Sequence, residues 1–113
     1  MHEVTEADLI RIFVGEDEKH RGKPLYEAIV QAARTHDLAG ATVLQGVMGY
    51  RGEKPIHTAK ILRLSEQLPM VVEIVDTTEK VQAFLPTLAE LVGHGLVTIE
   101  RVRVLAPKDG PPT

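Results

Sequence analysis

Two helical stripes, each lying between apolar strand segments, constrain the fold of this chain more than any other feature. The first stripe has apolar members three and four residues apart: Leu25, Ala28, Ile29, Ala32 and Ala33. The second stripe repeats this spacing later in the chain: Val81, Phe84, Leu85, Leu88, Leu91 and Val92. A strand–helix–strand order that occurs twice predicts an α+β, ferredoxin-like βαββαβ domain, with two helices on one face of an antiparallel sheet.

The expected strands are apolar segments bounded by glycine, proline or charged residues. They cover residues 9–15, 41–50, 70–76 and 96–105, with residues 56–64 as a further candidate. The first segment is largely apolar on both faces, which predicts a central place in the sheet. The sheet face without helices would expose apolar side chains such as Val43 and Val72, so we predict a homo-oligomer.

Helix boundaries are predicted from capping residues. Pro24 suits the first turn of the first helix, which would end near Leu38. Asp76, with Glu79 three residues later, would cap the second helix. Pro86 lies inside that helix and is expected to kink it, because it cannot donate a backbone hydrogen bond.

Length and composition fit one soluble domain. We place this domain at residues 8–105 of the 113-residue chain, between flexible termini at 1–7 and 106–113. There is no cysteine, which excludes disulfides and thiol catalysis. A formal net charge of −3 does not favour nucleic-acid binding. The acidic start lacks the features of a signal peptide, and no apolar run suggests a membrane span, so a cytoplasmic location is expected.

The stretch "QGVMGYRGEKPIH" is the first candidate site. Its glycines are Gly46, Gly49 and Gly52, and Tyr50 and Arg51 lie between the last two. Glycine lets backbone N–H groups approach a ligand closely, and an arginine can add a charge-assisted contact. A bulge followed by an ordinary turn explains the same glycines, and no Walker lysine follows them.

A charged loop, "GEDEKHRGK", is the second candidate site. It follows a central strand and precedes a helix N-terminus, a position where His20, Arg21 and Lys23 could meet an anion. Glu16 and Asp17 oppose that interpretation, and a solvated loop is the simpler one.

The five histidines are scattered, without the i, i+4 spacing of a helical metal site. A metal site would require His57 and His94 to meet across subunits. His36 is expected at a helix end, near the terminal carbonyl groups. No acid–base pair or nucleophile motif stands out, so the chain is not expected to be an enzyme.

Several blocks in order resemble the family known as domain of unknown function 190. They are "RIFVGED", "GKPLYEAIVQAARTHDLAGATVLQGVMGY", "IHTAKILRLSEQLPMVVEIVD" and "GLVTIERVRV". This family is similar in fold to the PII signalling proteins, which are ferredoxin-like trimers that bind adenine nucleotides between subunits and signal through a loop after the second strand.

The resemblance implies roles for particular residues. "GYRG" looks like the turn into the PII signalling loop, and Arg101 and Arg103 look like the basic residues that PII proteins place near phosphates. The place of the lysine-containing PII phosphate loop is taken by "GHGLVT", which lacks lysine. The implied ligand-binding set is Gly46, Gly49, Tyr50, Arg51, Gly52, His57, Lys23, Arg101 and Arg103.

Three functional hypotheses follow. The first is a homotrimeric PII-like regulator that binds ATP, ADP, AMP or a similar anion between subunits. Because genes of the resembled family often lie beside fluoride-exporter-type genes, this regulator would have a possible membrane transporter partner. The second is a metal-binding or structural trimer resembling divalent-cation-tolerance proteins. The third is a small enzyme with an active site between subunits.

Overall fold

A computed structural model describes residues 2–50, 57–58 and 68–107 of the chain. Its elements, in chain order, are β1 (His2–Gly15), β2 (Lys19–His20), β3 (Lys23–Pro24), α1 (Leu25–Thr35), β4 (Thr42–Gln45), β5 (Met48–Gly49), β6 (His57–Thr58), β7 (Pro69–Asp76), α2 (Thr78–Val92) and β8 (Leu96–Pro107).

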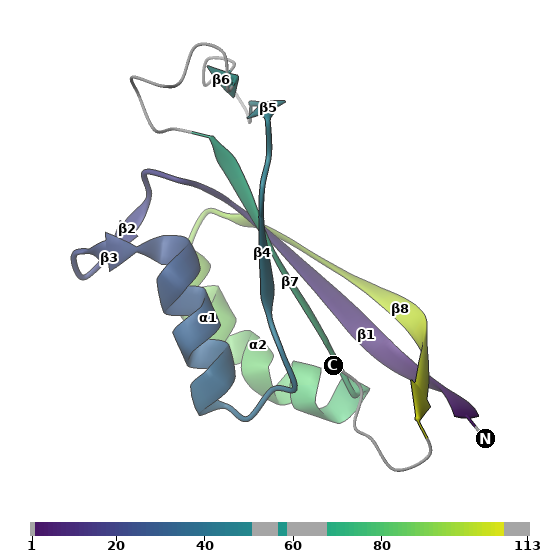
Figure 1. The fold of residues 1–113 in the computed structure, drawn as a ribbon. Coiled ribbons are helices and arrows are strands. Elements are labelled where there is room, and N and C mark those ends of the chain that lie inside the picture. The colour runs from purple at the N-terminus through teal and green to yellow at the C-terminus, as the bar shows by residue number, and fades with distance from the viewer. Residues whose placement is uncertain (1, 51–56, 59–67, 108–113) are drawn as a thin grey trace.

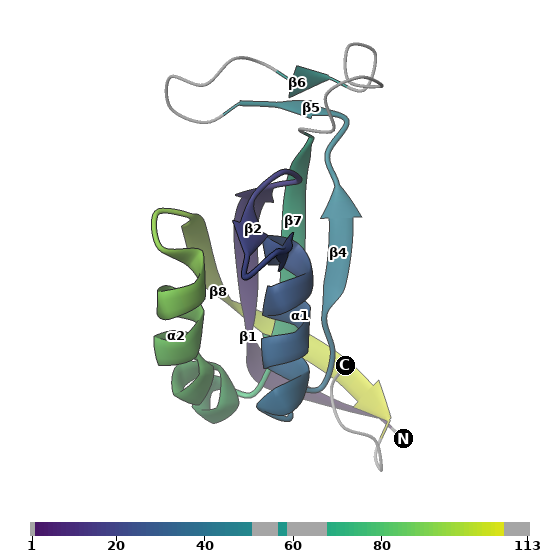
Figure 2. The same ribbon diagram turned by 90° about the vertical axis from the view of Figure 1, so that its left-hand side faces the viewer.

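The main sheet has four antiparallel strands in the order β4-β7-β1-β8, and both helices pack on one of its faces (Figure 1). This is the predicted α+β, ferredoxin-like arrangement. β1 lies between β7 and β8, as its two largely apolar faces predict. Two short strand pairs complete the fold: β5–β6 lies beyond one end of the sheet, and β2–β3 lies at the N-terminal end of α1 (Figure 2).

The core lies between the sheet and the helices. Alternate residues of the central strands point to the helices, and Ile10, Ile12 and Val72 have no exposed surface. They meet Ile29 of α1 and Phe84 of α2, which are also fully buried. The helical stripes and the two-residue strand period therefore bury the same apolar surface, and this burial is the main source of stability.

The predicted composition of the open sheet face is wrong in detail. Val72 is buried under the helices and Val43 packs against the same core, because both belong to the alternate set that points to the helix side. An apolar row instead crosses all four strands on the open face, through cross-strand partners Leu44, Val71, Phe13 and Leu96. Leu44 and Leu96 are each 48% exposed. Apolar surface without a cover is present, as predicted, but it comes from other residues.

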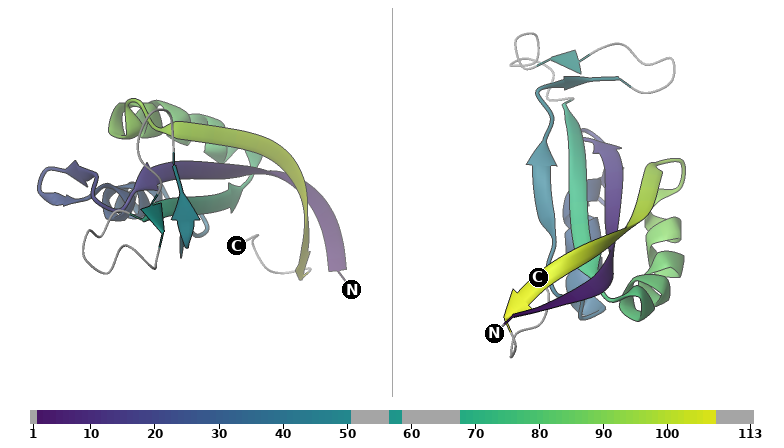
Figure 3. Two further views of the ribbon diagram at one scale, coloured as in Figure 1. Left: turned by 90° about the horizontal axis from the view of Figure 1, so that it is seen from above. Right: turned by 90° about the vertical axis from the view of Figure 1, so that its right-hand side faces the viewer.

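The first strand is longer than its apolar pattern predicts. It begins at His2 instead of residue 9 and pairs with β8 from His2↔Pro107 to Phe13↔Leu96. The two strands form a ribbon that curves beyond the rest of the sheet (Figure 3). Residues 2–7 and 106–107, which we expected to be flexible, are thus paired strand residues.

The second helix is capped by a different residue from the one predicted. Thr77 is the N-cap, and its hydroxyl accepts a hydrogen bond from the Lys80 N–H at 3.3 Å. The Asp76 carboxylate accepts hydrogen bonds from the N–H groups of Thr77 at 2.7 Å and Ala39 at 2.8 Å. Asp76 therefore ties the start of α2 to the segment between α1 and β4. The helix continues through Pro86 without being divided.

His36 follows the last residue of α1, as predicted, and acts as its C-cap. Its ring makes an edge contact with Phe84, with the ring centroids 5.4 Å apart, and its Nε2 lies 3.1 Å from the Thr87 hydroxyl. This histidine thus joins the two helices, which gives it a structural role.

Candidate functional site

Gly46 lies at the loop end of the sheet, which we define as the end where β1 stops at Gly15, β4 stops at Gln45 and β7 starts at Pro69. Its N–H donates a 2.7 Å hydrogen bond to the Pro69 carbonyl oxygen. A Cβ atom at Gly46 would lie 2.8 Å from the Pro69 Cγ. The close approach of this segment to Pro69 therefore requires a glycine at position 46, independently of any ligand.

Gly49 and Tyr50 continue from this point into the β5–β6 hairpin (Figure 2). A Cβ atom at Gly49 would lie 3.1 Å from the Pro69 Cγ, so this glycine also faces the proline. Gly49 pairs with His57, which brings the backbones of two predicted site residues together. Tyr50 is 65% exposed and is available to stack on a flat ligand.

Two acidic residues of the charged loop, Glu16 and Glu18, accept hydrogen bonds from other residues of the chain. The Glu16 carboxylate accepts a 2.9 Å hydrogen bond from Gln45, and the Glu16 N–H donates to the Leu68 carbonyl oxygen at 2.9 Å. The Glu18 carboxylate accepts a hydrogen bond from the Gly15 N–H. The Glu16 contacts join the end of β1 to the end of β4 and the start of β7. Both carboxylates therefore have hydrogen-bond donors within the chain.

Lys23 lies on the β2–β3 hairpin, above the start of α1. The Glu18 carbonyl oxygen accepts a 2.7 Å hydrogen bond from the Leu25 N–H, which fixes this hairpin to the first turn of the helix. Lys23 is exposed and forms no ion pair with any residue that the structure describes. Its ammonium group remains available for a ligand near the loop end.

Arg101 is already paired within the chain. Its Nε donates a 2.8 Å hydrogen bond to Asp8, the residue opposite it on β1, and its NH1 lies 3.6 Å from Glu6. Asp8 is only 4% exposed, and its hydrogen bond is the main reason that the pKa of Arg101 is raised above its ordinary value. A buried carboxylate thus neutralises much of the charge predicted to meet phosphates.

Arg103 lies on the same face of β8 as Arg101 and is exposed. Along the described chain it has no ion-pair partner, although it lies opposite Glu6 in the sheet register. Both arginines are far from the loop end. Asp8, opposite Arg101, is seven residues from Gly15 along β1, which corresponds to roughly 23 Å of strand.

The predicted ligand set is therefore divided within one protomer. Gly46, Gly49, Tyr50 and Lys23 lie near the loop end, whereas Arg101 and Arg103 lie toward the other end of the sheet (Figure 1). Only two copies of the chain could bring the two groups together. Arg51 and Gly52 lie outside the described residues, as does most of the candidate strand at 56–64.

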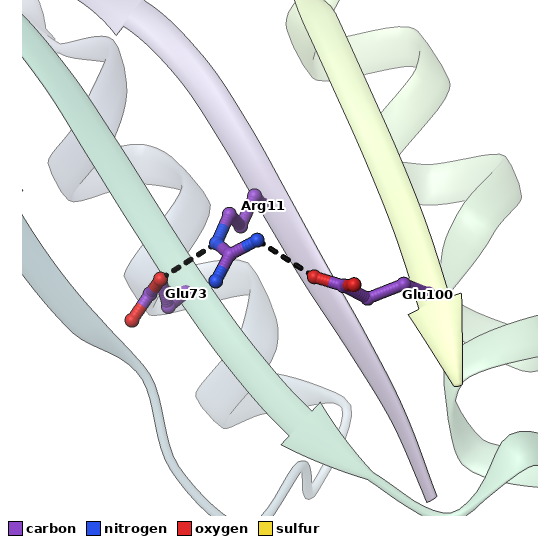
Figure 4. Close-up of polar contacts among 3 residues, drawn as sticks. All are labelled: Arg11, Glu73 and Glu100. Atoms are coloured by element: carbon purple, nitrogen blue, oxygen red, sulfur yellow. Dashed lines mark hydrogen bonds and ion pairs between the residues drawn. The ribbon is translucent and has the colours of Figure 1, made fainter. Parts of the chain in front are cut away.

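A charged network occupies the middle of the open sheet face (Figure 4). Arg11 donates hydrogen bonds to Glu73 on β7 at 2.9 Å and to Glu100 on β8 at 2.7 Å. The hydrogen bond to Glu73 is the main cause of the raised pKa of Arg11. Because the network borders the apolar row, this face combines exposed apolar surface with a hydrogen-bonded cluster of charges.

Clusters of metal-ligating side chains are absent from the described part of the chain. No three histidine, aspartate or glutamate side chains there converge as metal ligands. The same residues contain no helix long and apolar enough to cross a membrane.

Sequence reasoning missed three features of the site. Pro69, which explains two of the glycines, follows Gly46 by 23 positions, so the sequence gives no sign of their contact. The pairings of Arg101 with Asp8 and of Arg11 with Glu73 depend on sheet register. Opposite charges on predicted neighbouring strands were the available signal, but the register needed to match them was unknown.

Comparison with solved structures places the fold among PII-like proteins. CPII from Thiomonas intermedia K12, a nitrogen regulatory PII-like protein bound to ADP, AMP and bicarbonate, matches with a TM-score of 0.69 at 12% identity. The match covers 90% of this chain and 91% of CPII. CutA from Synechococcus elongatus PCC7942 matches with a TM-score of 0.62 at 13% identity, over 91% of this chain and 84% of CutA. The chain thus has an α+β, ferredoxin-like fold that it shares with CPII and CutA.

Comparison of sequences identifies the family of the chain. Residues 7–104 match domain of unknown function 190, described as an uncharacterised ACR. A "UPF0166 protein" of Aquifex aeolicus is 41% identical over 104 residues, which cover 90% of this chain and 96% of the relative. The chain belongs to the domain of unknown function 190 family, as its sequence blocks predict.

Proposed function

We propose that this protein is a non-catalytic PII-like regulator that binds an adenine nucleotide, or a similar small anion, between the subunits of a homotrimer. The observation that carries the proposal is the division of the candidate ligand residues between the two ends of one sheet. A complete site then needs the loop end of one copy and the arginine end of a neighbour.

The open sheet face supports the assembly. Its apolar row crosses the whole sheet, and Leu44 and Leu96 at the row's two ends remain about half exposed in one copy. Burying such a row between copies is favourable because it removes apolar area from water. Arg11 already donates hydrogen bonds to Glu73 and Glu100 before assembly, so its guanidinium is paired when a neighbouring copy covers it.

The nucleotide is supported by the chemistry of the two groups and by the fold. Tyr50 offers an exposed ring for a base, and Arg103, which has no ion-pair partner among the described residues, offers charge for phosphates. CPII, which shares the fold, has been solved with ADP and AMP. A transporter in the membrane as the regulated partner remains a prediction from the family resemblance.

Calorimetric titration with ATP, ADP and AMP tests the proposal. At least one nucleotide should bind the wild type, and Arg103→Ala should weaken that binding about tenfold or more, because a charge-assisted contact is lost. Arg34→Ala, which removes an exposed arginine from α1, is the matched control and should leave the affinity unchanged. Light scattering on the same samples should give the mass of a trimer.

Three results would contradict the proposal. A protomer in solution would leave the divided residues apart, and the absence of binding by every nucleotide would remove the ligand. Stabilisation against heat by copper or zinc, without any effect of nucleotides, would favour the alternative of a metal-binding trimer.

A further inference from the structure

A groove lies on the helix side of the molecule, and the β2–β3 hairpin and both helices contribute to its lining. The hairpin stands at the N-terminal end of α1 (Figure 2). It has a volume of about 530 Å³. Its walls come from the hairpin, from one side of α1 and from the C-terminal half of α2. This size suits a small metabolite.

The charge of the groove is mainly positive. The hairpin contributes His20, Arg21 and Lys23, and Glu90 of α2 is the one acidic residue of the lining. Neither Arg21 nor Lys23 forms an ion pair with a described residue. Glu16, Asp17 and Glu18 of the same loop do not line the groove, and Glu16 and Glu18 accept hydrogen bonds from Gln45 and Gly15. The positive charges thus remain available on one side of the groove.

The floor of the groove is apolar, and two of its side chains are short. Ala28 and Ala32 lie one turn apart on α1, and Leu91 of α2 lies across from them in the lining. All three are partly buried. Because alanine ends at Cβ, the two helices leave space there that larger side chains would fill. A ligand in this space would place an apolar part on the floor and its negative groups toward the hairpin.

The turn that presents Arg21 is held in an unusual conformation. Arg21 has φ of 52° and Gly22 has φ of 83°, so both central residues of the two-residue hairpin turn have positive φ. Glycine and asparagine adopt this conformation easily, whereas arginine does so rarely. Placing an arginine at this position has a conformational cost, which its charge at the rim of the groove would explain.

We infer that this groove is a second ligand site, separate from the proposed site between subunits, and that it binds a small anion with phosphate or carboxylate groups on a short apolar body. The groove belongs to the helix side, opposite the apolar row, and therefore stays open when the sheet faces associate. Glu90 favours ligands that also carry a hydroxyl or ammonium donor. The inference does not rest on the proposed nucleotide site.

Titration of the full-length protein with phenyl phosphate, followed by nuclear magnetic resonance, tests the inference. Saturable shift changes should appear at the Gly22 N–H and at the methyl groups of Ala28 and Ala32. Arg21→Gly should weaken this binding about tenfold or more, because it removes one charged contact. The fold should survive, since glycine adopts the positive φ of that position without strain. Benzyl alcohol, which has the apolar body without the charge, should cause no saturable change.

Three further variants locate the effect. Asp37→Gly makes the same kind of replacement at the other non-glycine residue with positive φ, 59°, in the part of the chain that the structure describes, and should leave phenyl phosphate binding unchanged. Ala28→Leu should block binding by filling the floor while keeping every charge. Arg103→Ala should not alter it, which separates this groove from the nucleotide site. Failure of phenyl phosphate to give saturable changes in the groove, or equal affinity in Arg21→Gly and the wild type, would overturn the inference.

Discussion

At the scale of single residues, the close approach of Gly46 to Pro69 explains why a glycine is needed at position 46, and its effect on stability can be measured. A methyl group at Gly46 would lie 2.8 Å from Pro69 Cγ and 3.3 Å from the Pro69 carbonyl oxygen. We expect Gly46→Ala to lower the free energy of unfolding by about 1–3 kcal/mol, as overpacked sites do. Urea denaturation measures this loss. Gly40→Ala, where no atom lies within 4 Å of the added Cβ, is the control and should have a much smaller effect.

The double variant Gly46→Ala/Pro69→Ala separates packing from ligand binding at the same position. Removing the proline ring should recover much of the lost stability. If Gly46→Ala alone proves as stable as the wild type, the close approach to Pro69 is not the reason for this glycine. Sequence reasoning identified the glycines because they stand out locally, but it could not identify their partner across the sheet.

At the scale of elements, Asp76 joins the start of α2 to the segment between α1 and β4. Its carboxylate is 3% exposed and accepts hydrogen bonds from Thr77 and Ala39. Asp76→Ala should cost about 2–4 kcal/mol of unfolding free energy, because two backbone donors lose their acceptor. Thr77→Ala should cost only about 0.5–2 kcal/mol, the usual effect of losing an N-cap.

Thermal or urea unfolding of these two variants orders the effects. A larger loss in Thr77→Ala than in Asp76→Ala would mean that the link to Ala39 contributes little. Asp76→Asn is the conservative variant, and it should recover part of the loss because its amide oxygen can still accept one of the two hydrogen bonds.

The elements themselves were largely predictable because their signals are local. The stripe from Leu25 to Ala33 and the apolar run of β7 each reveal a helix or a strand within about ten residues. The start of β1 was not predictable in this way. Its residues 3–6 are mostly polar and exposed, since that part of the ribbon pairs with β8 beyond the helices. Backbone pairing without a buried face leaves little trace in a sequence.

At the scale of the whole molecule, the apolar row is the surface on which assembly is expected to depend. Leu44→Glu should break the proposed trimer into smaller species, because each copy would have to bury a charge in the interface. The protomer should remain folded, since Leu44 is 48% exposed and lies outside the core. Ala83→Glu, at an exposed position on α2, is the matched control.

Light scattering and circular dichroism together check this prediction. An unchanged mass for Leu44→Glu would show that assembly uses another surface. From the sequence, we predicted an apolar open face but assigned Val43 and Val72 to it, and both point to the helix side. The strand pattern alone does not tell which of two apolar faces the helices cover.

The distance along β1 between Gly15 and Asp8, which lies opposite Arg101 of β8, has a consequence for how the protein would respond to dilution. If each pocket takes one half from each of two neighbours, ligand and chain concentration become thermodynamically linked, and the metabolite promotes assembly as much as assembly promotes its capture. A defective copy would then spoil the pockets on both of its sides, so that one altered chain per ring could silence most of the ring.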